Sequence, residues 1–367
     1  MNNNCNKISV RQTCALIILE VLGVGFVVIP RFALVLAWRD GFAAIILASV
    51  IIGCYTAFIL KIINKYGGLD LFRICESSLG SVPAKLLRWG FVVKTVLFTG
   101  FCLRMFAETV TQVVEGDIPV VIIMLTMGLC TLYPAVMGRQ VRGRLAELLL
   151  VPVLAVLVFV FACGITRGGN DELLPVLSEG GRDIAAAAFS IILWFYPIEY
   201  VLMSLPYIKN RDKLKKSCAW TTFGVGMLIA AIFALTLVRF GGAQMRSMDY
   251  PVLEMMYSVN LPGSFIERQE GLMMGIWVTG VFFTVGGGIY HSGLCAAEML
   301  KGISSNIASS LCVLGAFAIG LLPDSGGKAG YYMINVVLFT ECAYLIVLPL
   351  VLCLALFWEG RKNEAGD

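Results

Sequence analysis

Several ionisable side chains lie inside segments that are otherwise apolar, and these residues define where chemistry could take place. A charged side chain inside an apolar span costs at least about 2.5 kcal/mol on insertion scales, so such residues are functional by default. Acids and bases of this kind can pair with each other, bind a proton or recognise a charged solute. The set comprises Glu20, Lys94, Arg104, Glu108, Glu199, His291 and Glu341.

Glu20, Lys94 and Glu199 form the group that we expect to meet in the interior. A helix rises about 1.5 Å per residue, which places both glutamates within about one turn of the middle of their spans and Lys94 slightly deeper on the same side. We therefore predict that Lys94 neutralises Glu199 or Glu20 beneath a ligand, and that ligand or proton binding reorganises this pair. The alternative is an ion pair that only holds helices together.

Two glycines, Gly23 and Gly25, lie near the centre of the first apolar segment. Glycine costs about 1 kcal/mol relative to alanine in a helix interior, so the pair predicts an unwound turn whose backbone groups need partners. A carboxylate would then bind the free amides of Gly23, Val24 and Gly25 at the start of the second half-helix. Phe26 follows them and belongs to the same predicted site. Close helix packing through small residues is the alternative.

Pro197 interrupts the sixth apolar segment at a similar depth, because proline lacks a backbone donor and clashes with the preceding turn. Its neighbours Tyr196, Ile198 and Tyr200 are predicted to select the rest of the ligand. The two interruptions are five spans apart, as in two inverted five-helix repeats that face each other around a site at the midplane. The sequence thus predicts a 5+5 inverted repeat with broken helices 1 and 6.

The remaining ionisable residues carry weaker predictions, and their roles stay open. Arg104 and Glu108 are four residues apart on one helix face, as expected of a structural ion pair. His291 is the single histidine of the chain, and we expect it to be hydrogen-bonded beside Tyr290. The chain has no HExxH motif, CxxC pair or Cys/His cluster. Because a nucleophile with an adjacent base is also missing, the sequence predicts no metal, no cofactor and no enzyme activity.

These residues are carried by a chain of 367 residues, of which 59% are hydrophobic and only 14% charged. Soluble domains carry about 25% charged residues, so the composition predicts an all-α integral membrane protein. A spanning helix needs about 20 apolar residues, and ten transmembrane helices are predicted on this basis. They cover residues 8–36, 42–63, 87–110, 117–137, 146–165, 184–208, 218–240, 271–300, 303–322 and 331–358. We expect a single polytopic domain with repeats at residues 8–165 and 184–358.

An even number of spans places both termini on one side of the membrane. Most of the 28 lysines and arginines lie on the termini and on the loops of that side, which the positive-inside rule makes cytoplasmic. The net charge of +4 therefore reflects topology in the lipid bilayer and does not indicate nucleic-acid binding. Residues 69–80 and 245–268 predict short interfacial helices on the cytoplasmic and outer surfaces, respectively. The first apolar segment is longer than the core of a cleaved signal peptide, so we expect it to remain as the first span.

Four groups of residues make the chain resemble a known family. They are ISVRQ at 8–12 with LGVG at 22–25 and PR at 30–31, GLDL at 68–71 with LG at 79–80, EYVL at 199–202 with PYIK at 206–209, and FIERQE at 265–270 with IW at 276–277. Together they resemble the spore germination permeases, the B subunits of nutrient germinant receptors, within the amino acid-polyamine-organocation superfamily. The resemblance covers nearly the whole chain. Where the superfamily usually has glycine at the break in the sixth span, this chain has Pro197.

The resemblance implies a ten-span inverted repeat, placement in the inner membrane of the spore, and a complex with an A subunit and a lipoprotein C subunit. It also implies recognition of a small nutrient, commonly an amino acid, at the breaks in spans 1 and 6. A receptor subunit that triggers germination is therefore the expected function. A proton-coupled amino-acid permease is the alternative, because both functions need the same site.

Overall fold

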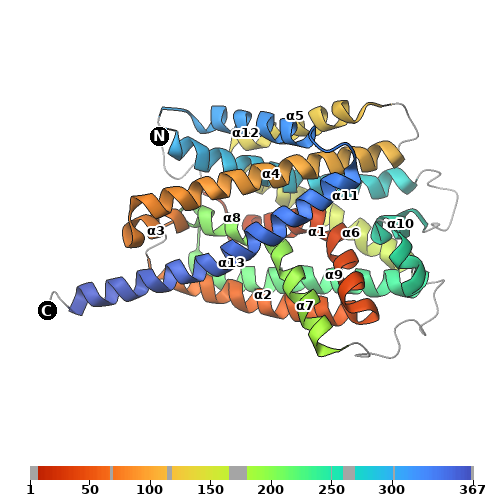
Figure 1. Cartoon of the computed structure of the whole chain (residues 1–367), viewed down its shortest axis with the longest axis horizontal. Helices are drawn as coiled ribbons and strands as arrows, with labels where there is room; N and C mark the ends of the chain where they lie inside the picture. The colour runs from red at the N-terminus through yellow and green to blue at the C-terminus, as the bar shows by residue number, and fades with distance from the viewer. Residues whose placement is uncertain are drawn as a thin grey trace.

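The computed structural model describes residues 7–66, 69–113, 118–164, 180–248, 250–258, 269–300 and 302–364, and its helices form one elongated bundle (Figure 1). Besides a backbone bridge between Ile8 and Ile208, these residues form helices and connecting turns. The helical elements are α1 (Val10–Ala37), η2 (Trp38–Asp40), α2 (Gly41–Asn64), α3 (Leu71–Leu79), α4 (Ser81–Val113), α5 (Val120–Met137), α6 (Arg139–Gly164), α7 (Gly181–Ile192), η5 (Leu193–Phe195), α8 (Pro197–Ser204), η6 (Leu205–Tyr207), α9 (Arg211–Ser247), α10 (Pro251–Ser258), α11 (Gln269–Met299), α12 (Ser305–Gly320) and α13 (Gly326–Glu364).

Within the described residues, the segments predicted to span the membrane are helical over most of their length. Each coincides with one helix, except the sixth, which is divided between α7 and α8. Within the described residues, five helical stretches are long and apolar enough to cross a membrane, or six if the bent α7–α8 pair counts as one span. One of these stretches, Val10–Asn64, contains both α1 and α2, and α12 is a shorter apolar helix. The chain is therefore a multi-pass membrane protein.

The first and last helices have their outer ends at the same end of the bundle. In Figure 1, α13 ends on the left beyond α3, whereas α10 lies at the opposite end. α3 packs against α13 through Cys75 and Val351. The start of α1 lies at this end too, because the Ile8 amide donates to the Tyr207 carbonyl and the Ile8 carbonyl accepts from the Lys209 amide, both at 2.9 Å. An even number of crossings explains this arrangement.

Each of the two regions predicted to form an interfacial helix contains a short helix. α3 begins after Asp70, whose carboxylate accepts a hydrogen bond from the Arg73 amide at 2.9 Å, and it ends at Gly80, whose φ of 92° favours glycine. Its apolar face is buried and its polar face is exposed. α10 occupies part of the predicted region 245–268, of which residues 259–268 lie outside the described residues, as do Gly68 and most of the FIERQE motif.

The predicted break in the first span is wrong, because α1 continues as a helix through Gly23 and Gly25. Gly23 instead permits close contact with α11. A Cβ atom on Gly23 would lie 2.2 Å from the Thr284 hydroxyl oxygen and 2.4 Å from the Gly280 carbonyl oxygen. Small residues allow helix backbones to approach in this way, so tight packing, the alternative considered for this pair, is the observed role of Gly23.

Two hydrogen bonds fix the contact between α1 and α11. The indole N–H of Trp277 donates to the Gly23 carbonyl at 3.0 Å. The Thr284 hydroxyl donates to the Glu20 carbonyl at 2.8 Å. Because glycine has no side chain, the Gly23 carbonyl is accessible to the indole. The two side-chain donors are additional to the hydrogen bonds within the helix, which stays continuous.

The predicted break in the sixth span is confirmed. α7 and the 3-10 turn η5 end before Tyr196, α8 begins at Pro197, and the two halves meet at a bend of 42°. Pro197 has no amide to donate to Leu193, and its ring disfavours a regular preceding turn. The Glu199 amide donates to the Tyr196 carbonyl at 2.9 Å, which starts the second half-helix.

Replacing Gly23 with alanine tests the packing of α1 on α11. Overpacking a filled core costs about 1–3 kcal/mol, which outweighs the roughly 1 kcal/mol that alanine gains over glycine in a helix. We expect Gly23→Ala to lower the melting temperature of the purified protein in detergent. Gly25→Ala is the matched control, because its Cβ would meet only Ile29 and Val21 of the same helix. Equal melting temperatures for Gly23→Ala and the native chain would contradict the contact.

Candidate functional site

Lys94 of α4 joins two acids in the bundle interior. Its Nζ atom lies 2.5 Å from Oε2 of Glu199 on α8 and 2.7 Å from Oε1 of Glu341 on α13. The three side chains are 4%, 10% and 11% exposed, respectively. The predicted pairing of Lys94 with Glu199 is confirmed, and Glu341 is a second partner that the sequence marked only as ionisable. We call Lys94, Glu199 and Glu341 the acid–lysine cluster.

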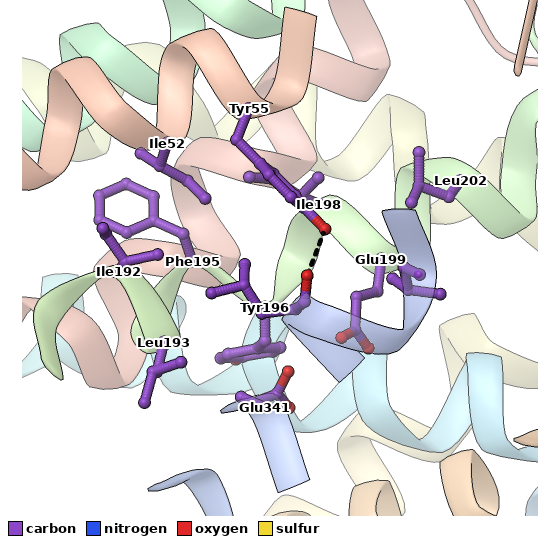
Figure 2. Close-up of a pocket in the computed structure, with 12 residues that line it drawn as sticks. Ile52, Tyr55, Ile192, Leu193, Phe195, Tyr196, Ile198, Glu199, Leu202 and Glu341 are labelled. Atoms are coloured by element: carbon purple, nitrogen blue, oxygen red, sulfur yellow. Dashed lines mark hydrogen bonds between the residues drawn. The ribbon is translucent and has the colours of Figure 1, made fainter. Parts of the chain in front are cut away.

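Aromatic rings enclose the acid–lysine cluster. The Lys94 ammonium lies 4.2 Å from the ring centroid of Tyr344 and 5.4 Å from that of Phe91. Cation–π attraction therefore adds to the ion pairs. Tyr55 of α2 approaches the same region, and its hydroxyl donates to the Leu345 carbonyl at 3.3 Å (Figure 2). The cluster is thus closed off by α2, α4 and α13.

A small cavity of about 30 Å³ adjoins the break between α7 and α8 (Figure 2). Glu199 and Glu341 line it together with Tyr196 and Ile198. A water needs about 10–15 Å³ by this measure, so the cavity has room for one or two waters. A larger solute requires the surrounding side chains to move.

Glu20 belongs to a different ion pair. Nη2 of Arg142 lies 2.7 Å from Oε1 of Glu20, and both side chains are 3% exposed. Gly287 of α11 makes room for the pair, because a Cβ there would lie 2.7 Å from the Glu20 carboxylate oxygen. Arg142 precedes the predicted fifth span, but α6 begins at Arg139 and carries Arg142 into the bundle. The alternative that Lys94 neutralises Glu20 is therefore wrong.

Tyr196 and Tyr200 lie between these two groups of charges, within electrostatic range of both. The Tyr196 hydroxyl lies near Thr284, whose own proton is donated to the backbone, and it has no well-formed hydrogen bond within the described residues. The indole N–H of Trp194 is also buried without a partner there. Buried polar atoms are rarely left unpaired, so these two are candidate contacts for a ligand.

His291 is held in place by Tyr200 and by the backbone. The two rings stack at a centroid distance of 4.2 Å, and Tyr290 meets the histidine edge-on at 5.0 Å. Nδ1 of His291 lies 2.9 Å from the Gly287 carbonyl oxygen. The predicted hydrogen-bonded histidine beside Tyr290 is confirmed. The sequence does not predict the stack on Tyr200, because the two residues are on different helices.

The residues predicted to bind a ligand are all buried, but only those of the sixth span meet at a break. At that break lie Tyr196, Pro197, Ile198 and Tyr200. On the continuous helix α1 lie Gly23, Val24, Gly25 and Phe26. Because amides inside a continuous helix donate to carbonyls four residues earlier, the free amides of Gly23, Val24 and Gly25 that the predicted carboxylate site requires do not occur on α1. Phe26 packs edge-on against Phe161 of α6 at a centroid distance of 6.3 Å.

A larger cavity of about 480 Å³ lies at the end of the bundle away from α3. We call it the vestibule; α1, α4 and α13 line it together with Tyr250, which precedes α10. Phe32 is part of its wall, and the Phe32 ring packs against Trp194 at a centroid distance of 5.9 Å. These two rings therefore separate the vestibule from the break in the sixth span.

Arg104 and Glu108 form an ion pair beside the vestibule, and Glu108 lines the cavity. Nε of Arg104 lies 2.6 Å from Oε1 of Glu108, which confirms the predicted structural pair. The other carboxylate oxygen of Glu108 accepts a hydrogen bond from the Gly326 amide at the start of α13. A carboxylate at a helix N-terminus is stabilised by the exposed amides and the helix dipole. Glu108 thus anchors α13 to α4.

The Glu20–Arg142 pair provides a test of how burial affects stability. Removing one partner of a buried ion pair costs about 3–5 kcal/mol, because the remaining charge is uncompensated. We expect Arg142→Met to lower the melting temperature of the purified protein strongly, and Arg142→Met combined with Glu20→Met to recover most of the loss. Arg11→Met is the control, because Arg11 pairs with Glu147 while its own side chain is 78% exposed. A double variant as unstable as the single one would rule out this cause.

Solved transporter structures share the fold of this chain. Mhp1, a nucleobase-cation-symport-1 family transporter solved in a closed conformation with bromovinylhydantoin bound, aligns with a TM-score of 0.63 and 13% identity, covering 94% of this chain and 80% of Mhp1. A mutant of the manganese transporter of Eremococcus coleocola aligns with a TM-score of 0.60 and 14% identity, covering 92% and 77% of the two chains. These likenesses agree with the predicted inverted-repeat fold, apart from the unbroken α1.

Sequence comparison identifies the relatives of the chain. Spore germination protein A2 of Bacillus subtilis (strain 168) is 26% identical over 363 residues, covering 93% of this chain and 95% of the relative. Spore germination protein B2 of the same organism is 21% identical over 374 residues and covers 100% of both chains. The family model described as spore germination protein, or spore permease, matches residues 7–325. This chain therefore belongs to the spore germination protein family.

Proposed function

We propose that this chain is the membrane subunit of a nutrient receptor that triggers spore germination, and that it binds a small nutrient of the amino-acid class. One observation carries the proposal: at the break in the sixth span, Tyr196, whose hydroxyl has no well-formed hydrogen bond within the described residues, lines the same cavity as Glu199 and Glu341. Helices broken at mid-depth form the solute sites of transporter folds. The proposed link between nutrient binding and germination is supported by membership in the spore germination protein family.

The vestibule supports a route for the nutrient to this site. It lies at the end of the bundle away from Ile8, and it reaches the break through the contact between Phe32 and Trp194. If the termini are cytoplasmic, as the basic loops predict, the vestibule opens on the outer side. A nutrient entering there has to displace the Phe32 ring before it meets the polar atoms of the break.

The nutrient site that we propose is built from side chains of the sixth span. Tyr196, Ile198 and Tyr200 contact the solute, and Pro197 keeps that segment bent. Phe26 borders the site from α1. Gly23, Val24 and Gly25 shape the facing helix through its close packing on α11 and do not bind a carboxylate through their amides.

The buried ion pairs would couple nutrient binding to helix movement. The pair of Lys94 and Glu199 joins α4 to α8, and the pair of Arg142 and Glu20 joins α6 to α1. A solute that displaces Tyr196 or Tyr200 moves α8 relative to Lys94. The energy of the ion pair then changes, since Coulomb attraction at low dielectric is steep with distance.

The setting of this subunit follows from the same proposal. The chain would lie in the inner membrane of the spore with both termini in the cytoplasm, as repeats 8–165 and 184–358 of one domain. It would act in a complex with an A subunit and a lipoprotein C subunit. Similarity to relatives named as spore germination proteins supports this setting.

A proton-coupled amino-acid permease is the second candidate function. The likeness to solved transporters favours it, because the same bundle moves solutes in those proteins. The two functions differ in output, since a permease turns over its solute and a receptor responds to occupancy. Uptake and germination therefore have to be measured on the same spores.

Germination of spores that carry or lack this chain tests the proposed function. We expect deletion to abolish the germination response to one amino acid among a panel of amino acids, sugars and nucleosides, without reducing uptake of that amino acid.

We also expect Tyr196→Phe to raise the nutrient concentration for half-maximal germination about fivefold, because one hydrogen bond contributes roughly 1 kcal/mol. Tyr133→Phe on the exposed face of α5 is the matched control. Loss of uptake together with germination would favour the permease.

Filling the vestibule tests the proposed route. Gly330 lines it, and a side chain at this position would meet open space, so Gly330→Trp should fold normally. We expect the nutrient concentration for half-maximal germination to rise about tenfold, equivalent to roughly 1.4 kcal/mol. Gly224→Trp is the control, because Gly224 also faces open space but lies on the exposed surface of α9. An unchanged response in Gly330→Trp would exclude entry through the vestibule.

A further inference from the structure

The acid–lysine cluster is unbalanced in charge, whereas the other buried ion pair is balanced. Lys94 contacts both Glu199 and Glu341, so one positive charge faces two acids. Glu20 and Arg142 are at least as deeply buried, at 3% exposed each, but they form a one-to-one pair. The two groups therefore serve as an internal comparison within one bundle.

The two acids of the cluster are direct neighbours. Their oxygens contact the same Lys94 nitrogen, at 2.5 Å for Glu199 and 2.7 Å for Glu341. Because both contact this one nitrogen, the two carboxyl groups face the same region, as Figure 2 shows. An ionised carboxylate has no proton to donate, so two of them can share a hydrogen bond only when one is protonated.

Among the residues that the structure describes, the side chains around the cluster add no second positive charge. From α2 and α13, Tyr55 and Tyr344 face the cluster, but their hydroxyls donate to the backbone carbonyls of Leu345 and Leu87. At the break, Tyr196 packs edge-on against Tyr200 of α8, and from α11 His291 stacks against Tyr200. On α4 itself, the flanking basic residues are engaged elsewhere in the described structure, Arg88 with Glu298 and Arg104 with Glu108.

A net charge in the core of the bundle is energetically unfavourable. Charged groups in a membrane core are costly unless they are paired, and two like charges that share a site cannot both ionise readily. Buried groups in this position bind or release a proton instead of remaining charged. One proton on the pair of acids would make the cluster neutral, as the Glu20–Arg142 pair already is.

We propose that Glu199 and Glu341 together hold one exchangeable proton, so that the acid–lysine cluster is a proton-binding site in the core of the bundle. The proton comes from water and resides on an oxygen of either carboxyl group. The cavity of about 30 Å³ that Glu199 and Glu341 line has room for the water that delivers it.

Proton binding here has a mechanical consequence. Glu199 lies two residues after Pro197 on α8, while its partners lie on α4 and α13. Loss of the proton leaves two carboxylates, one on α8 and one on α13, that repel each other beside Lys94. The position of α8 therefore depends on the protonation of the cluster. This inference stands without any nutrient and is independent of the proposed receptor function.

Infrared spectroscopy of the full chain in lipid nanodiscs, with no nutrient present, tests the site. We expect a carboxylic acid C=O band at neutral pH, which Glu341→Gln removes while leaving the neutral pair of Lys94 and Glu199. Glu20→Gln is the matched control, because Glu20 is a buried acid with its own arginine, and the band should persist in it. A band that is unchanged in Glu341→Gln, or that is lost in Glu20→Gln instead, would overturn the proposal.

A second measurement on the native chain avoids dependence on any one variant. The melting temperature in nanodiscs should fall as the pH is raised from neutral to alkaline, because loss of the proton exposes the repulsion between the two acids. In parallel, the C=O band should disappear over the same pH range. A band that persists at alkaline pH, or its absence throughout the range, would refute the shared proton.

Discussion

Neutralisation of charge inside the bundle is the constraint on which the rest of the structure depends. Lys94 draws α8 and α13 toward α4, and Arg142 draws α1 toward α6. Each of these contacts joins helices that are distant along the chain. In a medium that solvates charge poorly, a side chain without its partner would be expelled or neutralised by a proton. The ion pairs therefore determine where the broken sixth span lies and which of its faces is available.

The sequence predicts breaks in spans 1 and 6, but only span 6 is broken, and this difference has a physical cause. Proline lacks a backbone donor and crowds the preceding turn, which favours the bend seen at Pro197, although Pro152 and Pro349 lie inside continuous helices. Glycine only permits a departure from helical geometry. At Gly23 the absence of a side chain is used instead for contact with Gly280 and for the hydrogen bond from Trp277. The candidate site therefore rests on side chains around one break and not on bare amides from two.

The same bundle can serve transport or signalling, and the chain combines features of both. Its fold is shared with transporters at 13–14% identity, while its relatives over the full length are spore germination proteins. In the proposed function, the path of the nutrient runs from the vestibule at one end of the bundle to the broken sixth span and its charge cluster. Occupancy of such a path can change helix positions whether or not the solute passes through.

The sequence by itself determined the features that depend on local composition. Apolar runs of spanning length, the break at Pro197, the i,i+4 pair of Arg104 and Glu108 and the helix after Asp70 all follow from residues close together in the chain. Only the tertiary structure decided which partner each buried charge has. Arg142 was assigned to a segment before its span, and Glu341 had no predicted partner, yet they complete the two buried groups. Periodicity and hydropathy report whether a residue is in a helix and in lipid, whereas ion pairing between helices depends on rotation and depth, which the packing of the whole bundle sets.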